Sequence, residues 1–179
     1  MSKIEEAKQI LKDIGLPKRQ QNDRSALVLL ALCNIKEKDK WSDAKAQSMS
    51  VVGNKDNPKY EGIMRFIAEN YNIPYAENSR ETIRRQTLHQ FEQAGIVQHN
   101  PENPELPTNS KDNHYRLTPE VIKVIKAYNS KRWKKELKEF KKNVGFLRDK
   151  YLKKKEFNKI PIKLKNGTKL SFSPGKHNE

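Results

Sequence analysis

A segment near the middle of the chain combines side chains that can hydrogen bond to the edges of DNA bases. When the residues of "RETIRRQTLHQFEQAG" (80–95) are placed about 100° apart, apolar and polar side chains separate onto two sides. Arginine can bridge guanine, and glutamine can bridge adenine, in the major groove. Recognition helices present such side chains to that groove, mainly from their N-terminal half. The pattern therefore predicts a helix that reads duplex DNA, with an outward side that carries Thr82, Arg85, Gln86, His89 and Gln93.

Further basic side chains flank this outward side. Arg80 and Arg84 lie at its border, where they suit contacts with phosphate. Lys111, His114 and Arg116 belong to a polar loop and strand after the helix, and we expect them to contact the DNA backbone. The alternative is an ordinary solvated helix, because exposed helix faces are generally polar and charged. The order of the neighbouring elements favours DNA contact.

The charge of the chain favours a polyanionic partner. Its 179 residues include 37 Lys and Arg against 22 Asp and Glu, a formal net charge of +15. Residues 131–179 hold 17 of the basic residues and 5 of the acids, so the excess is concentrated in the last quarter. Because neutralising phosphates releases condensed counterions, double-stranded DNA is the expected partner.

An anionic membrane is the competing partner for a basic chain. The sequence has no apolar run of the length that spans a bilayer, and its acid-containing N-terminus is unlike a secretory signal. A basic amphipathic helix can lie on a membrane surface, but the apolar stripe of residues 131–157 is weak. We therefore expect no membrane partner.

Motifs for catalysis are sparse. Cys33 is the single cysteine and lies in the apolar run "ALVLLALCNI", so it is expected to be a buried thiol. The four histidines show no spacing typical of a metal site, and no nucleophile triad or phosphate-binding glycine loop is evident. Only "SPGKHNE" (173–179) resembles a site, because a Pro-Gly turn leads into polar residues ending at Glu179. A plain polar tail is the alternative.

Hydrophobic periodicity places these side chains on a mainly α fold with a small β component. Asn78 with Glu81 resembles a capping box, and Ser42 is a candidate N-cap. Thr118 before Pro119 suits the start of a further helix. We expect helices at 2–15, 24–35, 57–73, 78–95 and 119–129, and strands at 96–99 and 114–117.

This order of helices before a long-looped hairpin is that of a winged helix-turn-helix domain, expected over residues 1–130. Residues 131–157 predict a long basic amphipathic helix that links this domain to the last segment of the chain. That segment, residues 158–179, predicts a short terminal β-hairpin, because Asn166-Gly167 separates two alternating runs.

The end of the chain resembles a known enzyme family. "KIPIKLKNGTKLSFSPGKHNE" (159–179) is similar to the entry to the catalytic domain of the BsuBI/PstI family of type II restriction endonucleases, most specifically over 173–179. The helical region, including "RETIRRQTLHQFEQAG" and "HYRLTPE" (114–120), resembles the N-terminal domain of that family. The resemblance covers nearly the whole chain.

The resemblance implies a prokaryotic, cytoplasmic parent enzyme that binds palindromic duplex DNA as a homodimer and hydrolyses phosphodiesters with Mg²⁺. The family site is CTGCAG, and the nuclease domain is of the PD-(D/E)XK type, in which acidic residues hold Mg²⁺. Glu179 is the one residue that matches a possible active-site acid. The other catalytic residues would lie downstream, so we expect 158–179 to be a truncated start of the nuclease domain and the 179-residue chain to be inactive.

Two other functions remain open from the sequence. The chain could be a stand-alone winged-helix regulator of transcription, or an interaction module whose long helix binds a protein partner. A terminal hairpin buried against residues 1–130 would favour a complete regulator, whereas a hairpin that lies apart would favour the enzyme.

Overall fold

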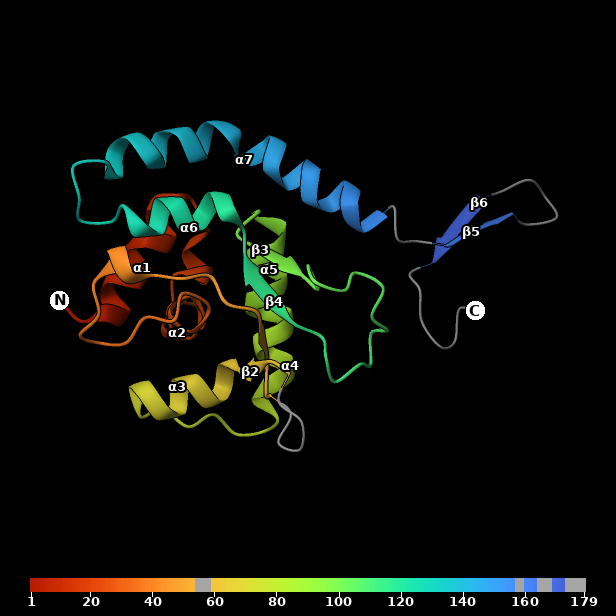
Figure 1. Cartoon of the computed structure of the whole chain (residues 1–179), viewed down its shortest axis with the longest axis horizontal. Helices are drawn as coiled ribbons and strands as arrows, with labels where there is room; N and C mark the ends of the chain where they lie inside the picture. The colour runs from red at the N-terminus through yellow and green to blue at the C-terminus, as the bar shows by residue number, and fades with distance from the viewer. Residues whose placement is uncertain (54–58, 157–159, 164–168, 173–179) are drawn as a thin grey trace.

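The computed structural model describes residues 1–53, 59–156, 160–163 and 169–172, with side chains up to Phe146. The described chain is mainly helical, with a small sheet beside the helices, which confirms the expected composition (Figure 1). Short 3-10 helices, η1 (Lys18–Gln20) and η2 (Trp41–Asp43), lie in its connections. The longer helical elements are α1 (Lys3–Ile14), α2 (Asp23–Leu32), α3 (Ile63–Tyr71), α4 (Ser79–Ile83), the π-helical η3 (Arg84–Leu88), α5 (His89–Gln93), α6 (Pro119–Lys126) and α7 (Trp133–Glu156).

The sheet of the helical domain is mixed. Its strands lie in the order β2-β1-β4-β3, and β3 with β4 forms the expected antiparallel hairpin. β1 pairs antiparallel with β4 and parallel with β2. Neither β1 nor β2 was predicted, because a two-residue strand is too short to show alternation. The expected start of the helix at 57–73 was wrong for the same reason, since β2 precedes α3 and the helix begins only at Ile63. The strands are β1 (Met49–Ser50), β2 (Glu61–Gly62), β3 (Val97–His99) and β4 (Tyr115–Leu117).

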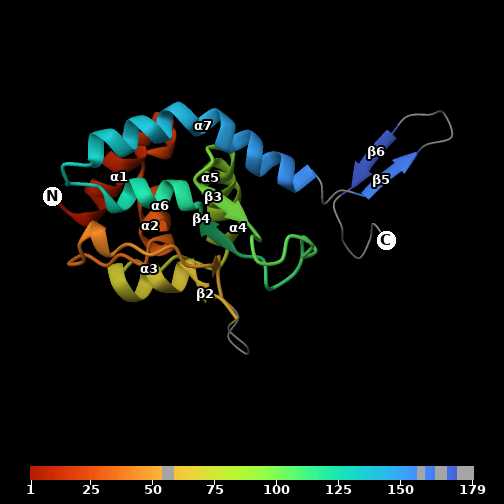
Figure 2. The same ribbon diagram turned by 45° about the horizontal axis from the view of Figure 1, so that its top comes forward.

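Helix α2 forms the centre of the core. Its residues from Ser25 to Leu32 are all buried, as its uniformly apolar sequence predicted. Cys33 comes next and is also buried, which raises the pKa of its thiol. Helices α1 and α3 and the segment η3 pack around α2 (Figure 2). The helix whose outward side carries the candidate DNA contacts is therefore anchored directly on the core.

Local capping explains several helix ends. Gly15 ends α1 at a φ of +104°, a conformation that costs glycine little. Thr118 begins α6 by accepting a hydrogen bond from the backbone N–H of Val121 at 3.4 Å. The capping box at Asn78 is absent, because that residue already has helical backbone angles and its side chain makes no cap bond. The prediction for Ser42 was also wrong, since Lys40 is the N-cap of η2.

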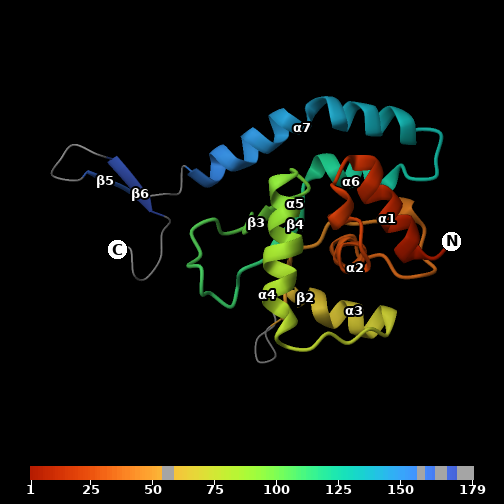
Figure 3. The same ribbon diagram turned by 180° about the vertical axis from the view of Figure 1, so that it is seen from behind.

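Helix α7 docks its first half on the domain and then extends past it (Figure 3). Trp133 packs edge-on against Tyr128, with 4.9 Å between ring centroids, and Phe140 is buried. The apolar stripe thus holds α7 against α6 and α1. The remaining stripe side chains, from Leu147 onward, lie outside the described side chains. Within the described ranges, no helix is long and apolar enough to cross a membrane.

The predicted terminal strands are present as β5 (Ile160–Lys163) and β6 (Lys169–Phe172). They pair antiparallel, with Ile160 opposite Phe172. Their ribbon lies beyond the end of α7 and apart from the helical domain in all three views (Figures 1 to 3). The predicted turn at Asn166-Gly167 lies outside the described residues.

Candidate nucleic-acid interface

Elements α4, η3 and α5 form one continuous helix with two distinct sides (Figure 3). The inward side chains Ile83, Leu88 and Phe91 are fully buried, and Thr87 is buried with them. The predicted separation of apolar and polar sides is therefore present, with Thr82 half-buried at the margin. We call the exposed set the reading face; it consists of Arg80, Arg84, Arg85, Gln86, His89 and Gln93.

The middle of this helix is a π-helical turn. Segment η3 contains Arg84, Arg85 and Gln86, so the central side chains of the reading face lie on widened backbone. π-turns are rare and are frequent at functional sites. The sequence analysis did not predict this turn, because it assumed a regular 3.6-residue period and a single π-turn spans only five residues.

Glu81 binds both arginines of the π-turn. Its carboxylate accepts two hydrogen bonds from Arg84, Nε to Oε1 at 3.2 Å and Nη2 to Oε2 at 2.8 Å. The Nε atom of Arg85 lies 3.2 Å from the same Oε2. The hydrogen bonds from Arg84 lower the pKa of Glu81, so the acid stays ionised. The carboxylate of Glu81 therefore neutralises part of the positive charge on the reading face.

Arg24 also reaches the reading face, and sequence reasoning missed it. From the first turn of α2, its Nε donates to Oγ1 of Thr87 at 3.1 Å and its Nη2 donates to Oε1 of Gln86 at 3.1 Å. One signal could have revealed it. Arg24 is the single basic residue in α2 and lies in its first turn, where the helix dipole disfavours a cation.

The loop and strand after the helix hold the other predicted contacts. Lys111 is exposed, and Arg116 on β4 is half-exposed, 3.9 Å from a carboxylate oxygen of Glu102. Both residues belong to the β3–β4 hairpin, whose strands lie beside α5 (Figure 1).

His114 does not lie on the surface, contrary to the prediction. Its ring is fully buried and stacks on Tyr60, with 4.2 Å between ring centroids. Its Nε2 accepts from the backbone N–H of Glu102 at 3.3 Å, so Nδ1 carries the proton and donates to the carbonyl of Asp112 at 2.8 Å. His114 therefore fixes the loop from inside instead of contacting a ligand.

Glu102 ties the same loop to the sheet. Its carboxylate accepts hydrogen bonds from the hydroxyls of Ser48 and Tyr60, each at 2.8 Å. The bonds from Ser48 and Tyr60 lower the pKa of Glu102. The loop that carries Lys111 is consequently held at both of its ends, although it contains little regular structure.

The expected metal chemistry has no counterpart among the described residues. Glu179 lies outside them. In the part of the chain that the structure describes, no group of three or more His, Cys, Asp or Glu side chains is placed to hold a metal ion. These residues do not fit Mg²⁺, and we derive no catalytic step from them.

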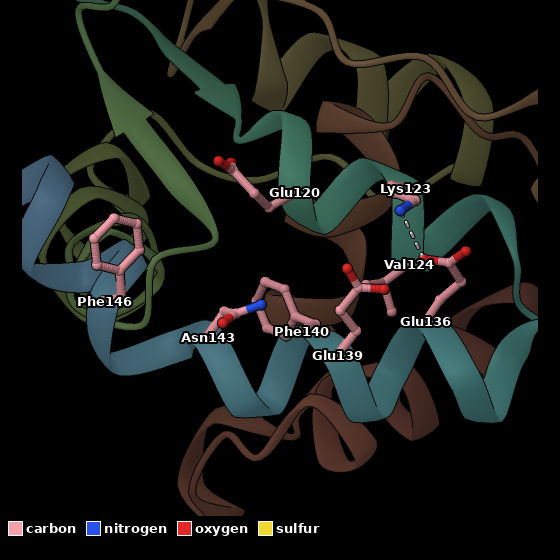
Figure 4. Close-up of a pocket in the computed structure, with 8 residues that line it drawn as sticks. All are labelled: Glu120, Lys123, Val124, Glu136, Glu139, Phe140, Asn143 and Phe146. Carbon is pink, nitrogen blue, oxygen red and sulfur yellow. Dashed lines mark ion pairs between the residues drawn. The ribbon is translucent and has the colours of Figure 1, made fainter.

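A pocket of about 280 Å³ lies between α6 and α7, and no residue of the reading face lines it (Figure 4). Phe140 and Val124 line its floor, and Phe146 at its edge is 71% exposed. An ion pair of 3.2 Å between Lys123 and Glu136 joins the two helices there. Further carboxylates in the lining, those of Glu120 and Glu139, make this pocket unsuitable for phosphate.

Comparison with known proteins identifies the family. Residues 1–149 match the family model described as the BsuBI/PstI restriction endonuclease HTH domain. The chain belongs to this family. The resemblance stated from the sequence is thus confirmed, and the match covers the reading helix, the hairpin and most of α7.

Two type II restriction enzymes are similar to this chain over nearly its whole length. It is 40% identical over 178 residues to "Type II restriction enzyme BsuBI" of Bacillus subtilis, which covers 99% of this chain and 54% of that protein. It is 28% identical over 170 residues to "Type II restriction enzyme AplI" of Arthrospira platensis, covering 95% and 49%.

A solved structure of a restriction endonuclease is also similar to this chain. The structure of SdaI restriction endonuclease matches with a TM-score of 0.70 and 29% identity, covering 98% of this chain and 52% of SdaI. The chain therefore spans about half the length of the relatives it matches.

Proposed function

We propose that this chain is the DNA-binding portion of a type II site-specific restriction endonuclease. The observation that carries the proposal is the reading face, a basic and amide-rich surface on a helix whose opposite side is buried in the core. The membership of the chain in a family of restriction endonucleases favours this function over a stand-alone regulator of transcription.

The proposed fold of residues 1–130 is a winged helix-turn-helix. Helix α3 and the helix α4–η3–α5 supply the helix-turn-helix, joined through residues 72–78. The β3–β4 hairpin comes directly after them and supplies the wing, and β1 extends its sheet. We assign residues 131–157, which include α7, to the linking segment and residues 158–179 to the start of the nuclease domain.

The proposed contacts divide by chemistry. Arg85, Gln86 and His89 read base edges in the major groove, with Thr82 and Gln93 at the ends of that row. The phosphate contacts come from Arg80, Arg84, Lys111 and Arg116, whose charge gives affinity without sequence information. His114 supports the wing from within.

The proposed reaction belongs to the parent enzyme. By family resemblance it is Mg²⁺-dependent hydrolysis of a palindromic duplex by a homodimer in a prokaryotic cytoplasm, with Glu179 as one active-site acid. Because the described residues lack a metal-binding set, we expect the 179 residues by themselves not to cut DNA. Incubation with duplex carrying CTGCAG and Mg²⁺ tests this, and robust cleavage would overturn it.

The DNA-binding proposal is tested by replacing residues that we propose to contact base edges with alanine. Arg85→Ala and Gln86→Ala should each reduce discrimination between CTGCAG duplexes and duplexes with one base pair replaced, by about tenfold at the base pair concerned. Arg132→Ala is the control, because Arg132 is exposed in the connection between α6 and α7. Unchanged sequence preference in both reader variants would remove this helix as the reader.

A further inference from the structure

We propose that Arg24 is a specificity-positioning residue: it holds the Gln86 amide in one of its two orientations and so fixes which hydrogen-bonding group meets the DNA. This inference rests on the proposed function of the reading face. It concerns a residue on a different helix, 62 positions earlier in the chain.

The geometry is a two-point attachment. The Nε of Arg24 donates to Oγ1 of Thr87 at 3.1 Å, and Nη2 donates to Oε1 of Gln86 at 3.1 Å. Thr87 is fully buried, so it anchors the guanidinium on the core side of the helix. The planar fork of arginine presents its donors in fixed directions, so a guanidinium held at Thr87 has little freedom at Gln86.

The chemistry of the guanidinium selects the amide orientation. Arginine has only hydrogen-bond donors, whereas the glutamine amide has one acceptor oxygen and one donor nitrogen. Only Oε1 of Gln86 can therefore face Arg24; the reverse orientation would bring the amide N–H groups against the cation. Nε2 of Gln86 is consequently directed away from Arg24.

This selection matters for base recognition. A glutamine that bridges adenine donates from Nε2 to N7 and accepts at Oε1 from N6. Oε1 has two lone pairs, so it can accept from Arg24 and from a base together. With the amide fixed before binding, the order of donor and acceptor on the reading face is set in advance. Without Arg24, the Gln86 amide could adopt both orientations, and discrimination between base pairs would fall.

The position of Arg24 agrees with such a role. Both of its partners belong to the π-turn η3, where the backbone of the reading helix departs from regular α geometry. A cation in the first turn of α2 opposes the helix dipole. Core packing gives no reason to place arginine there, because the later residues of α2 are buried and predominantly apolar.

The test is a double-mutant cycle on the full chain, with CTGCAG duplexes and duplexes carrying each single base-pair replacement. Arg24→Lys keeps the charge but cannot make both bonds from a rigid fork. We expect it to lower discrimination about three- to tenfold at the base pair that Gln86→Ala also affects. In the double variant the second change should add nothing at that base pair. Arg19→Lys, at an exposed arginine of η1, is the matched control and should behave as wild type.

The salt dependence separates positioning from a phosphate contact. The slope of log affinity against log salt should be the same in wild type and in Arg24→Met, which removes the charge, because a residue that contacts no phosphate releases no counterion. The thermal midpoint confirms folding of each variant. Additive losses, uniform weakening over all duplexes, or unchanged discrimination in Arg24→Lys would overturn the positioning role. If Arg85→Ala and Gln86→Ala both leave discrimination unchanged, the proposed function of the reading face fails as well; if they lower it and Arg24→Lys does not, only the positioning role fails.

Discussion

The carboxylate of Glu81 accepts two hydrogen bonds from the guanidinium of Arg84, with N–O distances of 3.2 and 2.8 Å. Glu81 lies one turn before the centre of the reading face. Arg85 shares one oxygen of the same carboxylate. Because all three side chains are exposed, this cluster is accessible to a polyanion, and phosphates would compete with Glu81 for the two arginines.

Removing that acid should strengthen DNA binding. Glu81→Gln frees both arginines and removes a negative charge that faces the phosphates. We expect the affinity for any duplex to rise about two- to fivefold at low salt, the range given by exposed ion pairs. Filter binding or fluorescence anisotropy measures it. Glu69→Gln, which breaks the similar exposed pair with Arg65 on α3, is the control. Weaker binding by Glu81→Gln would instead mean that the acid holds the arginines in their binding positions.

The acid sensitivity of the fold should depend on Glu102. Its pKa is lowered by the hydrogen bonds from Ser48 and Tyr60, so ionised Glu102 stabilises the folded state above its ordinary pKa of 4.5. That contribution is lost as the pH falls through the lower folded-state value. We therefore expect the Tm of the wild type to fall more steeply below about pH 4.5 than the Tm of Glu102→Gln. Glu105→Gln, exposed in the same loop, should follow the wild-type curve. Parallel curves for all three proteins would contradict this role.

Truncating two phenylalanines should change the free energy of unfolding by very different amounts. Phe91 is fully buried on the inward side of the reading helix, whereas Phe146 is 71% exposed on α7. Phe91→Ala should lower the free energy of unfolding by about 3–5 kcal/mol, because it leaves a cavity. Phe146→Ala should change it by less than about 0.5 kcal/mol. Urea denaturation measures both, and a large loss in Phe146→Ala would reveal packing that the exposed fraction does not predict.

Two glycines form a second matched pair. A Cβ at Gly62 would lie 2.1 Å from the carbonyl oxygen of Val52, so Gly62→Ala must displace β2 and should cost about 1–3 kcal/mol. A Cβ at Gly145 in α7 meets no described heavy atom within 4 Å. Gly145→Ala should therefore raise the stability of α7 by about 0.5–1 kcal/mol, since alanine favours helix. Thermal denaturation measured by circular dichroism tests both, and equal effects would contradict the steric argument.

The sequence by itself determined where the main helices lie, apart from the start of α3, and it determined the β3–β4 hairpin and the two sides of the reading helix. These features have local causes: apolar periodicity, the glycine that ends α1 and the capping threonine that begins α6. The family could also be recognised from short segments, because their residue order carries the resemblance directly.

Only the tertiary structure decided how the side chains of the reading face are held. Arg24 meets Gln86 across 62 residues, and His114 turns inward onto Tyr60, because the packing of elements far apart in the chain sets those distances. The strands β1 and β2 and the π-turn η3 likewise depend on partners or backbone adjustments that no local pattern encodes. Residue types can therefore indicate a DNA-reading surface, but the distances between helices determine which of its groups are free, which are paired and which are buried.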